Sequence, residues 1–135
     1  MRIAFGTDEA TNLTRGIVGG LVDAGHRVDV LADGDAWPDA GRRVGGAVAA
    51  GRADLGIVCC WTGTGVSIAA NHAGPAVRAA LCTDAETARG ARRWNDANVL
   101  ALSLRLMSEA LAEEIIVAFL GTPPDESERA EIDRC

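Results

Sequence analysis

The stretch DLGIVCCWTGTG, residues 54–65, decides the fold. Its first seven residues are almost all apolar, and such a run is typical of a strand that is buried on both faces of a parallel sheet. Two glycines follow, Gly63 and Gly65, and a helical segment then continues to Gly74. A buried strand, a tight turn and a helix together form the repeating unit of an α/β protein.

The same alternation extends in both directions from this stretch. The pattern of apolar residues predicts further strands at 2–5, 26–32, 76–82 and 98–103, and further helices at 11–24, 39–50, 83–94 and 108–121. Gly25 closes the first of these helices, Thr83 and Glu86 have the spacing of a capping box, and Ser108 is the expected N-cap of the last helix.

Five strands that alternate with helices predict a Rossmann-like, doubly wound α/β sheet of five parallel strands, with helices on both faces. The length suits a single domain over 1–135, with a polar tail at about 122–135 that docks on a partner subunit. We expect the common strand order 2-1-3-4-5. Strands 1 and 3 are then neighbours, so the loops after them form a crevice that gathers Asp8, Glu9, Cys60 and Thr62.

Charge and composition argue against several classes of protein. The net charge is −6, and no Lys/Arg block exceeds the pairs 42–43 and 92–93, so nucleic acid is not an expected partner. No apolar run approaches the roughly 20 residues of a membrane span, and the N-terminus lacks the apolar core of a signal peptide, so we expect a cytoplasmic protein without a membrane partner. Four cysteines without a C-x-x-C pair indicate neither a disulfide framework nor a zinc site.

The turn at 61–65 has the features of an anion site. Bare N–H groups and the positive end of the following helix favour an oxyanion or phosphate, and the same field lowers the pKa of a nearby thiol. The turn lacks the G-K-[ST] of a P-loop and the third glycine of a dinucleotide fingerprint, and no arginine stands where a cysteine phosphatase needs one. From the residues alone, two interpretations stay open: an anion site with a reactive cysteine, or a tight turn with an inert buried one.

Two longer patterns resemble a known family. CWTGTGVSIAAN (60–71) and VRAALCTDAETARGARRWNDANVLALSLR (77–105) are similar to ribose-5-phosphate isomerase B and its galactose-6-phosphate isomerase relatives. The resemblance is dense over 54–121, loose over 1–8 and poor over 26–50. It implies an aldose–ketose isomerase of the ribose 5-phosphate/ribulose 5-phosphate type that uses no metal or cofactor and works through a cis-enediolate.

The resemblance also implies roles for residues of this chain. Cys60 would be the base that moves a proton between C1 and C2 of a small sugar or sugar phosphate, and Thr62 would handle the proton on a neighbouring oxygen. Backbone N–H groups around Gly63 and Gly65 would hold the enediolate, because such a weakly acidic C–H needs its developing oxyanion stabilised. Asp8 would bind substrate hydroxyls.

Other contacts are implied across a subunit interface. Asn95 precedes strand 5, which the expected strand order puts at the opposite edge of the sheet from Cys60, and in the family this segment comes from the partner subunit. We therefore expect a homodimer, or a tetramer, with an active site shared between subunits. Arg105 after strand 5 and Arg129 in the tail are the residues that would bind the phosphate. Asn71 is expected to brace the glycine loop from its helix.

Two substitutions depart from the family pattern. Glu9, beside the substrate, stands where the family has a histidine, and Trp94 replaces the histidine that opens the furanose ring. An indole cannot exchange a proton at neutral pH, and the tail carries the acidic segment PPDESE (123–128) where positive charge is expected. Three hypotheses follow: a substrate that needs no ring opening, such as a tetrose 4-phosphate; an unphosphorylated or differently charged sugar; or ring opening by Glu9 or without catalysis.

Two rival functions stay open. A non-catalytic sugar-phosphate-binding protein, or a dependent subunit of a hetero-oligomeric isomerase, would keep the anion site without turnover. A thiol redox protein would use Cys59 and Cys60, although the chain lacks the C-x-x-C spacing. Cys59 points to the opposite face of its strand from Cys60, so we expect it in the core, and we expect Cys82 there as well.

Overall fold

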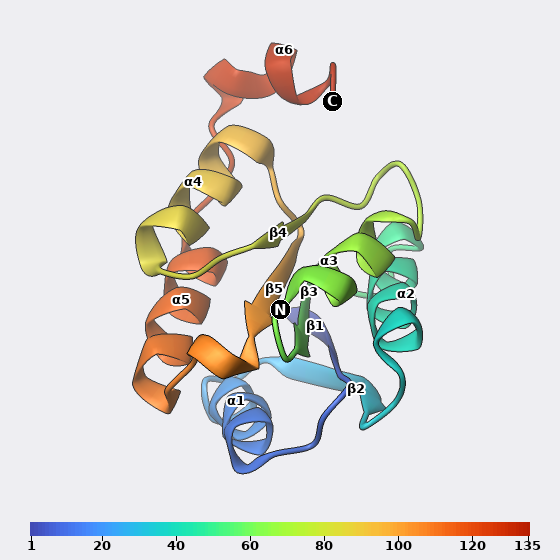
Figure 1. Cartoon of the computed structure of the whole chain (residues 1–135). Coiled ribbons are helices and arrows are strands. Elements are labelled where there is room, and N and C mark those ends of the chain that lie inside the picture. The colour runs from blue at the N-terminus through green and yellow to red at the C-terminus, as the bar shows by residue number, and fades with distance from the viewer.

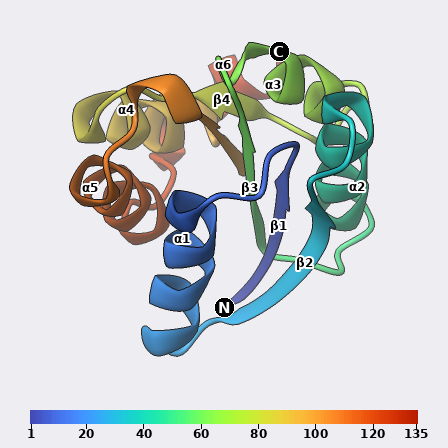
Figure 2. The ribbon, with the colours of Figure 1, turned by 60° about the horizontal axis from the view of Figure 1, so that its bottom comes forward.

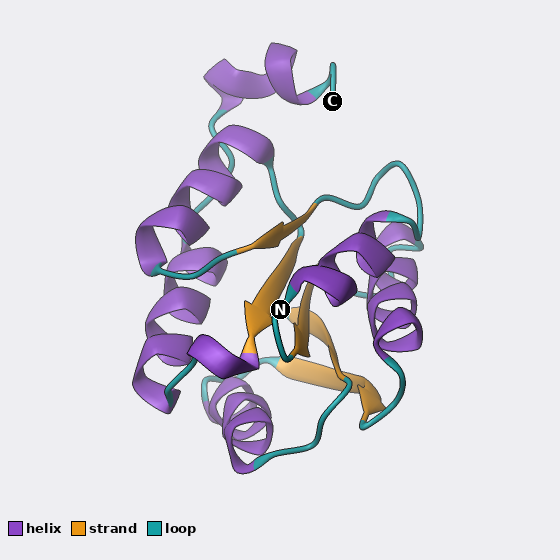
Figure 3. Cartoon of the chain, in the orientation of Figure 1, coloured by secondary structure: helices purple, strands orange, loops and turns teal.

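Five parallel strands form one sheet, and a helix follows each of them (Figures 1 and 3). The computed structural model describes residues 1–135. The strands are β1 (Arg2–Thr7), β2 (Arg27–Asp33), β3 (Leu55–Cys60), β4 (Ala79–Leu81) and β5 (Val99–Ser103). The helices are α1 (Asn12–Asp23), α2 (Trp37–Ala49), α3 (Thr64–Asn71), α4 (Ala85–Asn95), α5 (Glu109–Gly121) and α6 (Arg129–Ile132), with 3-10 turns η1 (Leu104–Leu106) and η2 (Glu126–Glu128). The expected Rossmann-like α/β architecture is confirmed.

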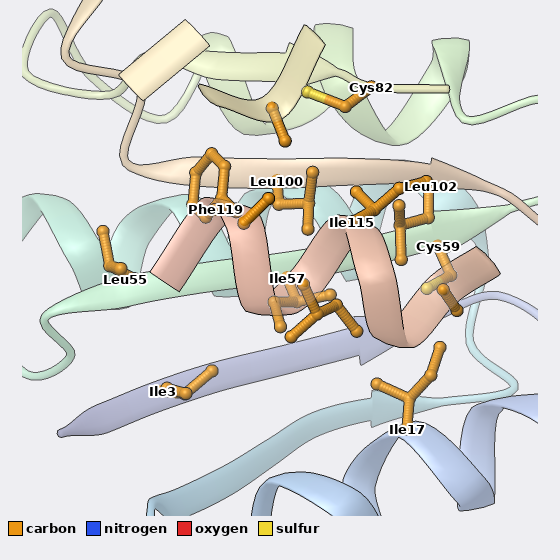
Figure 4. Close-up of a cluster of buried hydrophobic side chains, with 14 of the residues drawn as sticks. Ile3, Ile17, Leu55, Ile57, Cys59, Cys82, Leu100, Leu102, Ile115 and Phe119 are labelled. Atoms are coloured by element: carbon orange, nitrogen blue, oxygen red, sulfur yellow. The ribbon is translucent and has the colours of Figure 1, made fainter. Parts of the chain in front are cut away.

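The helices divide between the two faces of the sheet. Figure 2 shows α2 and α3 on one side of the strands and α1, α4 and α5 on the other. Strand β3 supplies both faces by simple alternation: Val58 and Cys60 join the cluster under α2 and α3, whereas Ile57 and Cys59 join the larger cluster under the other three helices. Figure 4 shows that larger cluster, in which Phe119 of α5 packs over the sheet.

The strand order is β2-β1-β3-β5-β4, so the expected order 2-1-3-4-5 is wrong for the last two strands. All five residues of β5 are buried, whereas the three residues of β4 are partly exposed. An apolar strand with side chains for both faces gains most in the interior, so β5 lies beside β3 and the short β4 takes the edge. Right-handed crossovers then place α3 and α4 on opposite faces, as observed.

The outer edge of β4 is partly covered by a side chain. The Asn71 amide donates to the Ala79 carbonyl at 3.1 Å and accepts from the Ala79 N–H at 2.8 Å. Asn71 therefore braces the edge strand, and the expectation that it braces the glycine loop was wrong.

The helix ends follow the sequence with one exception. Ser108 caps α5, and Gly25 follows α1 with a φ of 91°. The cap of α4 is Asp84, which accepts from the Thr87 N–H, rather than Thr83 with Glu86. No helix in the fold combines the length and the apolar character that crossing a bilayer demands.

Candidate active site

The carboxyl ends of β1 and β3 lie side by side. Thr7 pairs with Cys59 in the parallel ladder, and the Asp8 N–H donates to the Cys59 carbonyl at 3.2 Å. The loops that begin at Asp8 and at Trp61 therefore start from adjacent positions, as the sequence predicted from topology alone.

The adjacent cysteines lie in different environments. Cys59 is fully buried, and burial together with the negative charges near it raises the pKa of its thiol far above the ordinary range. Cys60 retains 5% exposure at the end of β3. Cys82 is also buried, and burial raises its pKa to about 11. Cys59 and Cys82 belong to the core, as expected.

Gly63 shapes the turn that follows Cys60. Its φ is 77°, in the left-handed region that favours glycine, and its N–H donates to Cys60 Sγ at 3.2 Å. A Cβ on Gly63 would lie 3.0 Å from the Leu102 carbonyl carbon, so the turn is pressed against β5. Only glycine satisfies both the backbone angle and this close approach.

The first turn of α3 offers backbone donors beside the sulfur. Ser67 donates to the Gly63 carbonyl, so the N–H groups ahead of it, at Thr64, Gly65 and Val66, have no intrahelical partner. The Thr62 and Thr64 hydroxyls lie 2.7 Å apart, and both residues are exposed. A thiol, two hydroxyls and free amide donors thus converge at one helix N-terminus, an arrangement suited to an anion.

Trp37, the first residue of α2, lies against this turn. A Cβ on Gly65 would lie 2.9 Å from the Trp37 ring, so the absence of a side chain at Gly65 lets the indole approach the backbone. The residue is 45% exposed. Trp37 was not among the predicted site residues, and its only signal in the sequence is an aromatic residue ahead of Pro38 at the helix start.

Asp8 carries an acceptor without a partner. Its Oδ1 is buried and makes no hydrogen bond, and it is the single buried side-chain oxygen or nitrogen in the chain of which this is true. Burial raises the pKa of the Asp8 carboxyl, and the charge of neighbouring Glu9 raises it further. Such a carboxylate costs free energy unless a ligand supplies a donor. Glu9 itself is exposed.

Strand β5 holds the other side of the turn. Ser103 pairs with Cys60 in the ladder, its hydroxyl donates to the Trp61 carbonyl at 3.0 Å, and the Arg105 N–H donates to the same carbonyl at 3.1 Å. The Arg105 side chain is exposed and takes part in none of the ion pairs of the chain. Arg105 is therefore a guanidinium group without a partner carboxylate, just after the end of β5, the strand that pairs with β3.

Asn95 and Arg129 lie at the other end of the strands. Because β5 adjoins β3, Asn95 is separated from Cys60 along the strands and not by the width of the sheet, which corrects the expected placement at the opposite edge. Asn95 and Trp94 line a groove of ≈ 570 Å³ between the start of β4 and the C-terminal tail. Trp94 is 59% exposed, and its ring packs against Gly90 one turn earlier.

Asp96 is a centre of charge that the sequence analysis did not single out. It has the one positive φ outside glycine, and its carboxylate pairs with Arg78 at 3.0 Å, Arg92 at 3.4 Å and Arg129 at 3.3 Å. Arg129 also contacts Glu126 and Asp133. Within one chain, the guanidinium of Arg129 is thus already engaged by carboxylates. The chain has no group of three or more His, Cys, Asp or Glu side chains placed to hold a metal ion.

The chain is similar to known proteins over almost its whole length. Residues 3–134 match the Ribose/Galactose Isomerase family. The chain belongs to that family. Ribose-5-phosphate isomerase B of Escherichia coli is 40% identical over 128 residues, which are 89% of this chain and 83% of that protein. D-erythrulose-4-phosphate isomerase of Pectobacterium atrosepticum is 37% identical over 75% of this chain and 66% of its own length.

Solved structures give the same result. Ribose-5-phosphate isomerase B of Clostridium thermocellum superposes with a TM-score of 0.90 at 36% identity, over 99% of this chain and 94% of that one. The enzyme of Thermotoga maritima also gives 0.90, at 34% identity, over 98% and 95% of the two chains. The chain is therefore a sugar-phosphate isomerase of this family.

Proposed function

We propose that this chain is an aldose–ketose isomerase for a small sugar phosphate, with Cys60 as the proton-transferring base. The observation that carries the proposal is the position of Cys60 Sγ, 3.2 Å from the Gly63 N–H and at the start of α3. A base for a weakly acidic C–H needs an oxyanion site beside it, and the unpaired N–H groups of this turn are suited to that task.

Cys60 and Thr62 account for every proton that moves in the proposed reaction. The Cys60 thiolate removes the proton from C2 of the aldose, and the electron pair moves to the carbonyl oxygen at C1, where backbone N–H groups stabilise the enediolate. Thr62 relays the O2 proton to O1. Cys60 then returns its proton to C1, which gives the ketose. Asp8 accepts a hydrogen bond from a substrate hydroxyl, and this hydrogen bond satisfies its unpartnered Oδ1.

Solvent exchange tests the base. Incubation with the sugar phosphate in deuterated water is expected to place deuterium on substrate carbon, and Cys60→Ala is expected to lose about 10²–10⁴-fold in exchange and turnover. Cys82→Ala, which changes a buried thiol outside the site, is the matched control. Full activity in Cys60→Ala would refute the assignment. Substrate binding without exchange in the unaltered protein would favour a binding protein or dependent subunit.

The preferred substrate is a sugar phosphate that cannot form a ring, such as a tetrose 4-phosphate. Its terminal oxygen carries the phosphate, so ring closure is blocked and no ring-opening acid is required. Trp94 stands where the family pattern has a histidine, and a relative that covers three quarters of this chain is a D-erythrulose-4-phosphate isomerase. Turnover of erythrulose 4-phosphate is expected to exceed turnover of ribose 5-phosphate, and Trp94→His is expected to narrow the gap. Faster turnover of the ribose ester would refute this choice.

The active site is proposed to be completed by a second copy of the chain. Asn95 and Arg129 lie at the amino end of the strands, whereas Cys60, Asp8 and Arg105 lie at the carboxyl end. In a two-fold dimer, each copy would give its Asn95 and Arg129 to the other's Cys60. Mixing Cys60→Ala with Asn95→Ala is then expected to restore part of the activity, because a mixed dimer retains one intact site. Mixtures that stay inactive, with both variants dimeric, would refute the shared site.

A further inference from the structure

Thr7 ends β1 directly before Asp8, and its side chain is completely buried. The Thr7 hydroxyl donates to the Glu9 carbonyl at 2.8 Å and accepts from the Glu9 N–H at 3.3 Å. One side chain thus bonds both polar groups of the residue that lies two positions ahead. The Thr7 carbonyl in turn accepts from the Gly34 N–H at 3.0 Å, so the residue is fixed to the neighbouring loop as well.

The position of Asp8 depends on these contacts. Its N–H is bonded to the Cys59 carbonyl, but its Oδ1 has no hydrogen-bond partner that would orient the carboxyl group. The direction of the side chain is therefore set by the backbone, both by the N–H of Asp8 itself, which lowers the pKa of the carboxyl group against the larger effect of burial, and by the residues on either side of it. The Asp8 N–H holds that backbone to β3 through the Cys59 carbonyl, and the Thr7 hydroxyl holds it through two hydrogen bonds to Glu9.

We propose that Thr7 is a positioning residue: its hydroxyl locks the Thr7–Glu9 turn and thereby keeps the Asp8 carboxylate in place as a free acceptor at the carboxyl end of β1. The inference rests on the proposed function, in which the Asp8 carboxylate accepts a hydrogen bond from a substrate hydroxyl. Thr7 touches neither the substrate nor the reacting atoms and acts through Asp8.

Three substitutions separate positioning from simple stability. Thr7→Val keeps the shape and removes the hydroxyl, Thr7→Ser keeps the hydroxyl, and Thr7→Ala serves as the second hydroxyl-free variant should the valine protein not fold. Thr122→Val is the matched control, because Thr122 is also a buried threonine whose hydroxyl donates to a backbone carbonyl, at the end of α5.

A positioning role and a purely structural role of Thr7 would change different kinetic constants. A displaced Asp8 weakens substrate binding in the ground state and the transition state alike, so KM is expected to rise about 10-fold or more in the hydroxyl-free variants while kcat changes little. Thr7→Ser is expected to restore KM. A purely structural role would instead lower kcat through the folded fraction and leave KM unchanged, as expected for Thr122→Val. Hydroxyl-free variants with an unaltered KM would overturn the inference.

A second readout needs no turnover. The Asp8 carboxyl signal is assigned in carbon NMR by its loss in Asp8→Asn, and its titration is followed in the free protein. Loss of the Thr7 hydroxyl is expected to hydrate the carboxyl group and move its pKa down toward the ordinary value. An unchanged titration in Thr7→Val or Thr7→Ala would overturn the positioning role. If the unaltered protein isomerises no sugar phosphate, the proposed function fails, and this titration still decides the role of Thr7.

Discussion

Replacing Gly63 by alanine tests how tightly the glycine turn is held against the sheet. Two costs are visible in the structure. An L-residue at a φ of 77° costs about 1–2 kcal/mol. The new Cβ would also lie 2.5 Å from Leu81 Cδ1, which is the end of a side chain and can move. It would lie 3.0 Å from the Leu102 carbonyl carbon and 3.1 Å from its oxygen, and the backbone of an interior strand cannot yield cheaply, so overpacking adds about 1–3 kcal/mol. Together the loss of unfolding free energy is about 2–5 kcal/mol, by addition of the two ranges.

Gly51 offers a control with the same backbone angle and no neighbours. Its φ is 72°, and a Cβ there would meet no atom within 4 Å, so Gly51→Ala carries only the cost of the angle, about 1–2 kcal/mol. Urea denaturation of both variants at constant slope gives the difference directly. Since Gly63→Ala also shifts the N–H that contacts Cys60 Sγ, we expect it to lose turnover, whereas Gly51→Ala is expected to keep it. Equal stability losses in the two variants would show that the turn is not pressed against β5.

Three further perturbations follow from burial and charge. Cys59→Ser places a hydroxyl at a fully buried position and is expected to cost about 1–3 kcal/mol in urea denaturation. Because burial also raises the pKa of the Cys59 and Cys82 thiols, iodoacetamide at pH 8 should label Cys135 and spare Cys59 and Cys82 until the chain unfolds. Burial, and then the charge of Glu9, raises the pKa of the Asp8 carboxyl group in the folded chain, so the stability that its protonation contributes is complete only below the ordinary pKa of 3.8 and is lost as pH rises. Between pH 4 and 7 the unfolding free energy of Asp8→Asn should therefore rise relative to that of the unaltered protein. A relative fall over that range would contradict the direction of the pKa shift. Asp96→Asn leaves three guanidinium groups without their shared carboxylate. Because these groups are partly exposed, the expected loss of unfolding free energy is reduced to about 1–3 kcal/mol. Breaking the exposed Arg134–Glu131 pair is the control and should leave thermal unfolding unchanged.

The architecture followed from sequence periodicity, but the strand order did not. The runs at 76–82 and 98–103 are both short and mostly apolar, and the expected order made no use of Arg78, the one charged residue that distinguishes them. Their difference lies in tertiary context: β5 fills both faces of the sheet, while only Ala79–Leu81 of the other run pairs. A prior on common topologies was therefore the sole guide, and it failed at the edge of the sheet.

The site was predictable where topology alone places residues, and not where side chains from distant segments meet. Asp8 and Cys60 follow neighbouring strands, so their proximity needed no structure. The contacts of Trp37 with Gly65, and of Arg78 and Arg129 with Asp96, join segments that are far apart in sequence. A positive φ at a non-glycine residue leaves no trace in composition, which is why Asp96 escaped notice.

The paired amide contacts of Asn71 have a consequence for how the protein behaves when concentrated. An unpaired strand edge is a template on which another polypeptide can add, and chains that stack in this way form fibrils. Here the Asn71 side chain occupies the N–H and the C=O of Ala79, the first residue of the edge strand β4. A single asparagine thus occupies part of the edge that a sixth strand would use and discourages polymerisation through β4.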